Sequence, residues 1–240
     1  MTAIVLVHGA WSDARVWSGV CRHLQSHGHR VVAPDLPAHG DDPTPPGEAT
    51  LDLYAQTVRR TLQELDAPAV LVGHSMAGTV ISTVAEQHPE LVSHLVYLAA
   101  FLLPDGQSLY SFTQTSPGMA ASALGPALRP QDGTLGIDPD AFIDVFCHDA
   151  PAALAQAARA RLKPDPLRPL GSPVVVTAQR WGATPRSYIH TGGDRCVSPA
   201  SQREMVDAVG VNAVATVEGS HLAMLSCPAE VAAAIATLAG

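Results

Sequence analysis

Short apolar runs alternate with longer amphipathic segments along most of the chain. The apolar runs are residues 3–7, 30–33, 69–72, 95–99, 187–191 and 213–217. Each run is short, and apolar residues occupy both of its faces. Such runs are typical of parallel strands that helices cover on both sides of a sheet.

Segments with helical periodicity lie between these runs, at residues 16–27, 50–65, 76–87, 199–209 and 228–238. In one of them Leu51, Tyr54, Ala55 and Val58 recur at the spacing of a single helical face, and Thr50 is a suitable N-cap. Alternation of strands and helices predicts an α/β fold with a doubly wound, mostly parallel sheet. A chain of 240 residues can form this fold as one domain with an insertion.

The alternation breaks between residues 102 and 185, where Pro, Gly and Ala are frequent and only residues 149–162 have a clear helical pattern. Irregular stretches of this length inside compact domains are usually lids or binding insertions, so we predict a cap over residues 102–185. A second interruption, residues 34–50, is interpreted as a Pro-rich surface connection. Within it, Asp35 and His39 are expected to form a turn that supports the site from below.

Composition narrows the class of protein. Hydrophobic residues make up 47% and charged residues 15% of the chain, as in compact globular proteins. The net charge of −8 disfavours binding to nucleic acid or to anionic membranes. The first residues show no secretory-signal pattern, and no apolar stretch reaches the roughly 20 residues that span a bilayer, so we expect a cytoplasmic protein. The four cysteines lack C-x-x-C spacing and are interpreted as reduced, small hydrophobic residues.

The stretch LVGHSMAGTV, residues 71–80, places Ser75 where a predicted strand ends and a predicted helix begins. In a nucleophile elbow the serine lies on a turn so tight that its neighbours must be small. Gly73, Ala77 and Gly78 meet this requirement, although Ala77 departs from the strict G-x-S-x-G pattern. Ser75 is therefore a candidate nucleophile; the alternative is a serine that only caps the helix.

A serine hydroxyl needs a histidine base, and the histidine needs an orienting carboxylate. In the elbow-containing fold these partners follow in the order Ser, Asp or Glu, His, at carboxyl ends of strands. Asp194 in YIHTGGDRC and His221 in VEGSHLAM satisfy this order. Asp105, which also follows a strand, is the rival acid, and the alternative for His221 is an ordinary loop histidine.

Ester hydrolysis also requires N–H donors for the oxyanion that develops on the carbonyl oxygen. The N–H of Met76, directly after the serine, is one candidate. The other is the N–H of Ala10 in the loop LVHGAW, where Gly9 allows the backbone to turn. We expect His8 to support this loop and not to act as a second base.

His23 and His27 lie one turn apart on a predicted helix and could share a metal ion. The helix supplies no third ligand in the same register, so we interpret them as a solvated helix end. No metal and no cofactor is predicted.

With these residues placed, the chain resembles the α/β-hydrolase superfamily, and within it the branch of plant methylesterases, hydroxynitrile lyases and bacterial esterase relatives. The similarity runs nearly the full length, through VLVHGAW, GHSMAG, LVYLAAFLLPDG, QRWGATPRSYI and EGSHLAM. The resemblance implies an α/β-hydrolase fold with a Ser75–Asp194–His221 triad. It further implies an oxyanion hole at Ala10 and Met76, and a substrate pocket bordered by Trp11, Met76 and Leu222.

Two positions separate the activities of this branch. Its hydroxynitrile lyases carry threonine where Gly9 stands and lysine directly after the catalytic histidine, where this chain has Leu222. Without that cation, departing cyanide lacks electrostatic support, so ester hydrolysis is favoured.

The expected function is therefore a serine esterase that cleaves a small, largely hydrophobic carboxylic ester, such as a methyl ester, through an acyl-enzyme. Its expected partner is a small-molecule ester, and no binding to nucleic acid or membrane is expected. The oligomeric state is left open, with a homodimer as one alternative. The alternatives are thioester or lactone hydrolysis, a specialised biosynthetic step on the same triad, hydroxynitrile lyase activity, and a non-catalytic small-molecule receptor.

Overall fold

A six-stranded parallel sheet forms the centre of the molecule in a computed structural model that describes residues 2–239. Its strands are β1 (Ala3–Val7), β2 (Arg30–Val32), β3 (Ala69–His74), β4 (Val92–Leu98), β8 (Arg186–Thr191) and β9 (Ala213–Val217). Their order across the sheet is β2-β1-β3-β4-β8-β9, and every pair is parallel. The six predicted strands are confirmed, with end residues that differ by up to three.

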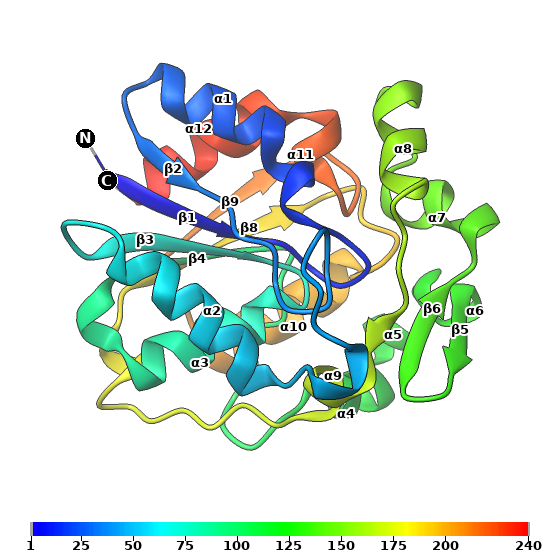
Figure 1. The fold of residues 1–240 in the computed structure, drawn as a ribbon, viewed down its shortest axis with the longest axis horizontal. Helices are drawn as coiled ribbons and strands as arrows, with labels where there is room; N and C mark the ends of the chain where they lie inside the picture. Colours follow the sequence, from blue (N-terminus) through cyan, green and yellow to red (C-terminus); the bar gives the residue numbers. More distant parts are fainter. Residues whose placement is uncertain (1, 240) are drawn as a thin grey trace.

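Helices cover both faces of the sheet, as the apolar strands predict. Figure 1 shows α1 (Ser18–Ser26) and α12 (Pro228–Leu238) on one face, with α2 (Leu51–Gln63) and α3 (Ala77–Gln87) on the other. Another long helix, α10 (Pro199–Val209), follows β8. Thr50 caps α2 as predicted, because its side chain accepts a hydrogen bond from the N–H of Leu53. The short helices of the main body are η1 (Ala14–Trp17), η2 (Pro46–Glu48), η3 (Pro89–Leu91) and α11 (Ala223–Ser226).

The sheet topology places a crevice at one defined position. The chain runs outward from β1 to β2 and then returns to form β3 on the opposite side of β1. In doubly wound sheets, ligands bind outside the carboxyl ends of the strands at such a reversal. The loop after β1 and the turn after β3 therefore meet where a site is expected.

Residues 102–185 leave the sheet between β4 and β8. Figure 1 shows the green part of this segment beyond the sheet edge to which the arrowhead of β1 points. The elements are α4 (Leu109–Thr115), α5 (Pro117–Ala120), α6 (Leu124–Ala127), β5 (Leu128–Gln131), β6 (Thr134–Ile137), α7 (Pro139–Phe146), α8 (Ala152–Arg159), β7 (Asp165–Pro166), α9 (Leu167–Gly171) and η4 (Trp181–Ala183). Strands β5, β6 and β7 form a separate antiparallel sheet.

The expectation that only residues 149–162 of this segment are helical was wrong. That region forms α8, but five further α-helices precede or follow it. They are 4–8 residues long, too short to show a periodic pattern. Local caps define several of them instead: the side chains of Ser108, Ser116 and Asp138 each accept a hydrogen bond from a backbone N–H of the first turn.

The interpretation of residues 34–50 as a surface connection was wrong for its first part. Leu36, Ala38 and His39 are buried, and the His8 ring accepts the N–H of Leu36. Residues 40–48 of the connection do lie toward solvent and include η2. Proline frequency gave no indication that the first part of the turn packs beneath the loop after β1.

Within residues 2–239, every helix is too short or too polar to cross a bilayer. The four cysteines are all free thiols, and Cys147 and Cys196 are buried. The division of the chain into one domain with a cap at residues 102–185 stays a prediction.

Candidate active site

Ser75 lies on a strained turn between β3 and α3. Its φ of 55° is in the left-handed region, which non-glycine residues rarely adopt. Backbone hydrogen bonds hold the turn, because the Ser75 carbonyl accepts the N–H groups of Gly78 and of Phe101, which follows β4, each at 3.0 Å. A side chain on Gly78 would place its Cβ 2.8 Å from the Phe101 nitrogen, so only glycine fits there. The elbow geometry predicted for LVGHSMAGTV is present.

His221 and Asp194 form a buried hydrogen-bonded pair next to this turn. His221 Nδ1 lies 2.8 Å from Asp194 Oδ2, and their side chains are 1% and 0% exposed. Among residues 2–239 no hydrogen bond joins the Ser75 hydroxyl to the His221 ring. Such contacts are often long in the absence of substrate and shorten when it binds. Asp105, the rival acid, is exposed and instead accepts the N–H of Val176 at 3.0 Å.

Asp194 accepts hydrogen bonds at both carboxylate oxygens. Oδ1 takes the backbone N–H groups of Cys196 and Val197, each at 2.8 Å. Oδ2 takes the Thr191 hydroxyl at 2.9 Å and the Gln202 amide at 3.2 Å, besides His221. These donors leave one orientation for the plane of the carboxylate. The sequence analysis did not identify Thr191 and Gln202, whose only signal is their position at the end of a strand and in the following helix.

The backbone of His221 is positioned by two side chains that sequence reasoning also missed. His74, the residue before the nucleophile, donates from Nε2 to the His221 carbonyl at 3.0 Å. Burial lowers the pKa of His74 well below its usual value, and the neighbouring His221 ring adds to this, so His74 is neutral. Asp149 accepts the N–H of Ser220 at 2.8 Å. The histidine in the GHS sequence therefore links the serine turn to the histidine loop.

The loop after β1 passes directly beside the serine turn. A Cβ on Gly9 would lie 2.8 Å from Ser75 Cβ and 2.9 Å from His74 Nδ1. Ala10 and Met76 follow Gly9 and Ser75 directly in the sequence, and within residues 2–239 neither of their N–H groups donates to a loop or turn carbonyl. Trp11, the next residue, has a φ of 54°, a strained conformation that costs about 1–3 kcal/mol.

His8 supports this loop, as the sequence suggests. Its Nδ1 donates to the Gly9 carbonyl at 2.9 Å, and its Nε2 accepts the N–H of Leu36 at 3.0 Å. This pattern requires a neutral ring. Burial and the nearby His39 ring lower the pKa of His8 to about 4, which agrees with that state.

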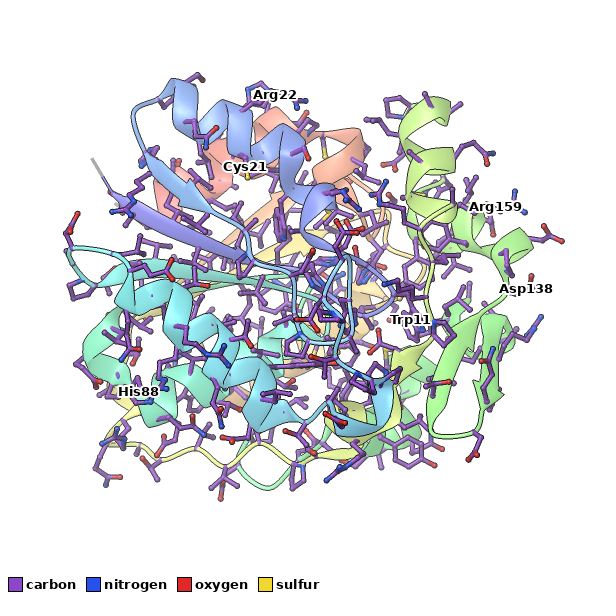
Figure 2. The ribbon with its side chains drawn as sticks, viewed as in Figure 1. Trp11, Cys21, Arg22, His88, Asp138 and Arg159 are labelled. Atoms are coloured by element: carbon purple, nitrogen blue, oxygen red, sulfur yellow. The ribbon has the colours of Figure 1, made fainter. Side chains whose placement is uncertain are left out.

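Trp11 also contacts the 102–185 segment. Its indole Nε1 donates to the Leu135 carbonyl at 2.6 Å, and its backbone N–H donates to Asp165 Oδ2 at 2.6 Å. Figure 2 shows Trp11 between the main body and the green segment that contains β5 and β6. The loop after β1 is therefore bonded to residues more than a hundred positions away.

Two pockets adjoin Trp11. A small pocket of about 10 Å³ is lined by Ala10, Trp11, His221 and Leu222, among others. A much larger cavity of about 560 Å³ lies within the 102–185 segment. Most of its lining is apolar and comprises Trp11, Leu109, Met119, Leu124, Leu128 and Leu170, with Tyr110 and Leu167 at exposed positions. Leu222 is thus placed beside His221, while Trp11 borders both spaces.

His23 and His27 lie at the end of α1. His27 Nδ1 donates to the backbone carbonyl of His23 at 2.8 Å, as at an ordinary helix end. Across residues 2–239 there is no group of three His, Cys, Asp or Glu side chains placed to hold a metal ion.

Comparison with known proteins identifies the family. A model of the alpha/beta hydrolase family matches residues 4–234. The chain belongs to the alpha/beta hydrolase family. This hydrolase is 29% identical to the pyrethroid hydrolase of Sphingobium wenxiniae. The alignment is 252 residues long and covers 100% of this chain and 88% of that protein. It is 30% identical to methylesterase 7 of Arabidopsis thaliana, covering 98% and 95% of the two chains.

The fold of this hydrolase agrees with solved relatives. The crystal structure of a pyrethroid hydrolase from Sphingobium faniae superposes with a TM-score of 0.90 at 28% identity, over 99% of this chain and 97% of that one. Together with the family match, these relatives identify the hydrolase as a carboxylic ester hydrolase.

Proposed function

We propose that this hydrolase is a serine esterase that cleaves a hydrophobic carboxylic ester through an acyl-enzyme on Ser75. The observation that carries the proposal is the buried His221–Asp194 hydrogen bond beside a serine held on a strained turn. A neutral His221 with its Nδ1 proton directed to Asp194 presents a free Nε2, which is the atom that a general base uses.

The proposed reaction has two steps. Ser75 Oγ attacks the ester carbonyl while His221 Nε2 takes its proton, and the carbonyl oxygen becomes negatively charged. The N–H groups of Ala10 and Met76 stabilise that oxygen, and His221 then returns the proton to the departing alcohol. Water, activated by the same histidine, hydrolyses the acyl-enzyme. The chemistry uses side chains and backbone alone, and no step calls for a cofactor.

The proposed substrate is an ester with a sizeable hydrophobic group. We assign residues 102–185 as the cap, and its cavity of about 560 Å³ lies within the range of about 300–1,000 Å³ that accommodates drug-sized ligands. Trp11 lines this cavity and also the small pocket that contains His221. The proposed substrates therefore include esters with larger acyl groups than the small, largely hydrophobic ester expected from the sequence.

A fluorophosphonate probe tests the nucleophile. It should label wild-type protein at Ser75, and Ser75→Ala should abolish both labelling and hydrolysis of p-nitrophenyl butyrate. Ser82→Ala is the matched control, since Ser82 is a buried serine on α3 whose hydroxyl bonds only within the fold. Labelling of a different serine would reject the assignment.

A chain-length series tests the cavity. We expect kcat/KM for p-nitrophenyl esters to rise from acetate to octanoate, because each buried CH₂ contributes about 0.8 kcal/mol. Leu124→Trp, which adds atoms to the cavity lining, should remove this rise while leaving acetate hydrolysis within about threefold. Leu154→Trp is the control, on an exposed leucine of α8 outside the cavity lining. A series that is unaffected by Leu124→Trp would exclude this cavity as the acyl site.

Two alternatives from the sequence are weakened by specific contacts. A hydroxynitrile lyase would need a cation beside His221, but Leu222 occupies that position in the small pocket. A non-catalytic receptor gives no reason for the many hydrogen bonds that orient Asp194. Thioester and lactone hydrolysis use the same machinery and are separated by assaying a thioester and a lactone beside the ester.

A further inference from the structure

Asp165 is a buried carboxylate that the proposed triad does not use. It lies in β7 of the cap, and its side chain is 0% exposed. One oxygen, Oδ2, accepts both the backbone N–H of Trp11 at 2.6 Å and the ring Nε2 of His39 at 3.0 Å. Burying a carboxylate is unfavourable unless it is paired and hydrogen-bonded, and these two donors satisfy Oδ2, while the buried Oδ1 has no hydrogen-bond partner within residues 2–239.

His39 is placed to carry a positive charge. Its Nε2 faces the Asp165 carboxylate and its Nδ1 faces the Pro37 carbonyl at 3.0 Å, and both partners can only accept. A neutral imidazole has a single N–H, whereas the imidazolium has two. Burial alone would lower the pKa of His39, but the charge and hydrogen bond of Asp165 outweigh it and raise the pKa above its usual value. His39 and Asp165 thus form a buried ion pair between the main body and the cap.

Trp11 depends on this pair for its conformation. Its positive φ is unfavourable for a large side chain, and the structure opposes relaxation with two hydrogen bonds, both to the cap. Loss of the Asp165 acceptor would remove the hydrogen bond of the half-buried Trp11 N–H and allow the peptide between Ala10 and Trp11 to rotate. The N–H of Ala10 lies one peptide before it and would be displaced as well.

We propose that Asp165 is a positioning residue for ester hydrolysis, which fixes the Trp11 N–H and through it the Ala10 N–H that faces the reacting carbonyl oxygen. This inference rests on the proposed function, in which Ala10 is an oxyanion donor. The cap therefore has two roles: it encloses the hydrophobic group and it holds half of the oxyanion hole in place.

This role predicts a particular kinetic signature. An oxyanion donor acts when negative charge develops in the transition state, and it contributes little to binding of the neutral ester. A displaced donor therefore lowers kcat and leaves KM nearly unchanged. A residue that only stabilised the cap would instead alter the melting temperature or KM.

The experiment compares Asp165→Leu with Asp165→Asn. Leucine cannot accept the Trp11 N–H, so kcat for p-nitrophenyl butyrate should fall about tenfold to a hundredfold, less than the 10²–10³ for complete removal of a donor. KM should stay within about threefold. Asparagine can place its carbonyl oxygen where Oδ2 lies, so it should restore kcat to within about fivefold of wild type. Asp140→Asn is the matched control, a cap carboxylate that pairs with Arg159 at an exposed position.

A second readout follows the oxyanion itself. An aryl trifluoromethyl ketone adds to Ser75 Oγ to give a tetrahedral adduct whose oxygen is negatively charged, with the serine proton passing to His221. Its inhibition constant should weaken in Asp165→Leu by the same factor as kcat. Asp165→Ala, which introduces no new bulk, replaces Asp165→Leu if that variant does not fold.

The outcomes separate this inference from the proposed function. If Ser75→Ala remains active, the proposed serine mechanism fails, whatever the Asp165 variants do. If Ser75→Ala is inactive but folded Asp165→Leu keeps its kcat and its affinity for the ketone, the positioning role of Asp165 is overturned alone. A change confined to KM or to melting temperature would also overturn it.

Discussion

Replacing Asp194 with asparagine is the most direct perturbation of the proposed triad. The substitution is nearly isosteric, and its effect follows from which atoms surround the carboxylate. Oδ1 accepts two backbone N–H groups, which can only donate, whereas at Oδ2 the Thr191 hydroxyl can rotate and the Gln202 amide can turn, so the asparagine oxygen takes the Oδ1 position. The NH₂ group then stands where Oδ2 accepts the His221 ring.

Asparagine would reverse the tautomer of His221. Facing an NH₂ donor, Nδ1 must become the acceptor, and the single ring proton moves to Nε2. His221 can then no longer take the Ser75 proton. Loss of the orienting carboxylate in this way lowers kcat by about 10⁴. At about 1.36 kcal/mol for each tenfold change in rate, this is ~5 kcal/mol of transition-state stabilisation.

Steady-state hydrolysis of p-nitrophenyl butyrate measures the effect, with circular dichroism to establish that each variant is folded. Asp105→Asn is the control, because Asp105 is exposed and accepts the N–H of Val176, far from the His221 ring in the hydrogen-bond network, so its kcat should stay within about twofold. A decrease of less than tenfold for Asp194→Asn would refute the tautomer argument. A larger effect of Asp105→Asn would transfer the role of the acid to that residue.

Three further predictions concern the loop after β1, the buried ion pair and the sheet. Gly9→Thr should lower kcat by at least about a hundredfold, because its Cβ would lie 2.8 Å from Ser75 Cβ and displace the nucleophile, as an esterase assay will measure. The raised pKa of His39 means that its ion pair with Asp165 stabilises the fold fully below the unfolded-state pKa of about 6.5, and that this contribution is lost as pH rises through the folded-state value. The difference in free energy of unfolding between wild type and His39→Gln should therefore shrink between pH 6 and pH 9 in urea denaturation. Leu71→Ala, at a fully buried position of β3, should cost about 2–5 kcal/mol by the same method.

Each of these predictions has its own control. Gly47→Thr tests threonine at a glycine with open space around it, and should retain activity. A wild-type difference from His39→Gln that grows with pH would show that the ring is neutral in the fold. Leu154→Ala, on an exposed leucine, should change the free energy of unfolding by about 0.5 kcal/mol or less, and an equal effect at Leu71 would contradict the packing argument.

The collision at Gly9 also bears on the relation to hydroxynitrile lyases. Gly9→Thr combined with Leu222→Lys introduces the threonine and the lysine that the family resemblance assigns to those enzymes. In this structure the threonine has no room beside Ser75, and the lysine would enter a buried position. We therefore expect cyanide release from mandelonitrile to stay at background in the double variant, since adapting the pocket requires movement of the whole serine turn.

The parts of the molecule that the sequence predicted are those in which local pattern and tertiary structure agree. The strands are continuous apolar runs because helices cover both faces, and Thr50 begins α2 because its side chain meets the first turn. Asp194 and His221 could be predicted because the fold delivers the ends of neighbouring parallel strands β8 and β9 to one edge. Chain order alone left Asp105 as a rival, and in the structure the His221 ring bonds to Asp194, whereas Asp105 accepts the N–H of Val176.

The features that the sequence did not predict lack a local periodic pattern or join residues that are far apart in the sequence. The cap helices are defined by individual caps over 4–8 residues, which a periodicity search does not detect. The His39–Asp165 pair joins residues 126 positions apart, and nothing near either residue indicates the other. The elbow motif assigns no role to His74, and its bond to the His221 carbonyl becomes evident only when β3 and the loop after β9 are brought together.

The loop that holds Asp194 also contains a cysteine whose reactivity depends on the opening of this loop. Cys196, whose backbone N–H bonds to the Asp194 carboxylate, has a fully buried thiol, and burial together with the charge of Asp194 raises its pKa well above the usual value. A protonated, enclosed thiol does not react with alkylating reagents until the loop opens. The rate of Cys196 modification by iodoacetamide would therefore measure how often this loop opens in the native state. This rate can be followed by mass spectrometry of the peptide that contains Cys196. The same rate, measured with and without an inhibitor, would show whether a ligand in the active site reduces the frequency of loop opening.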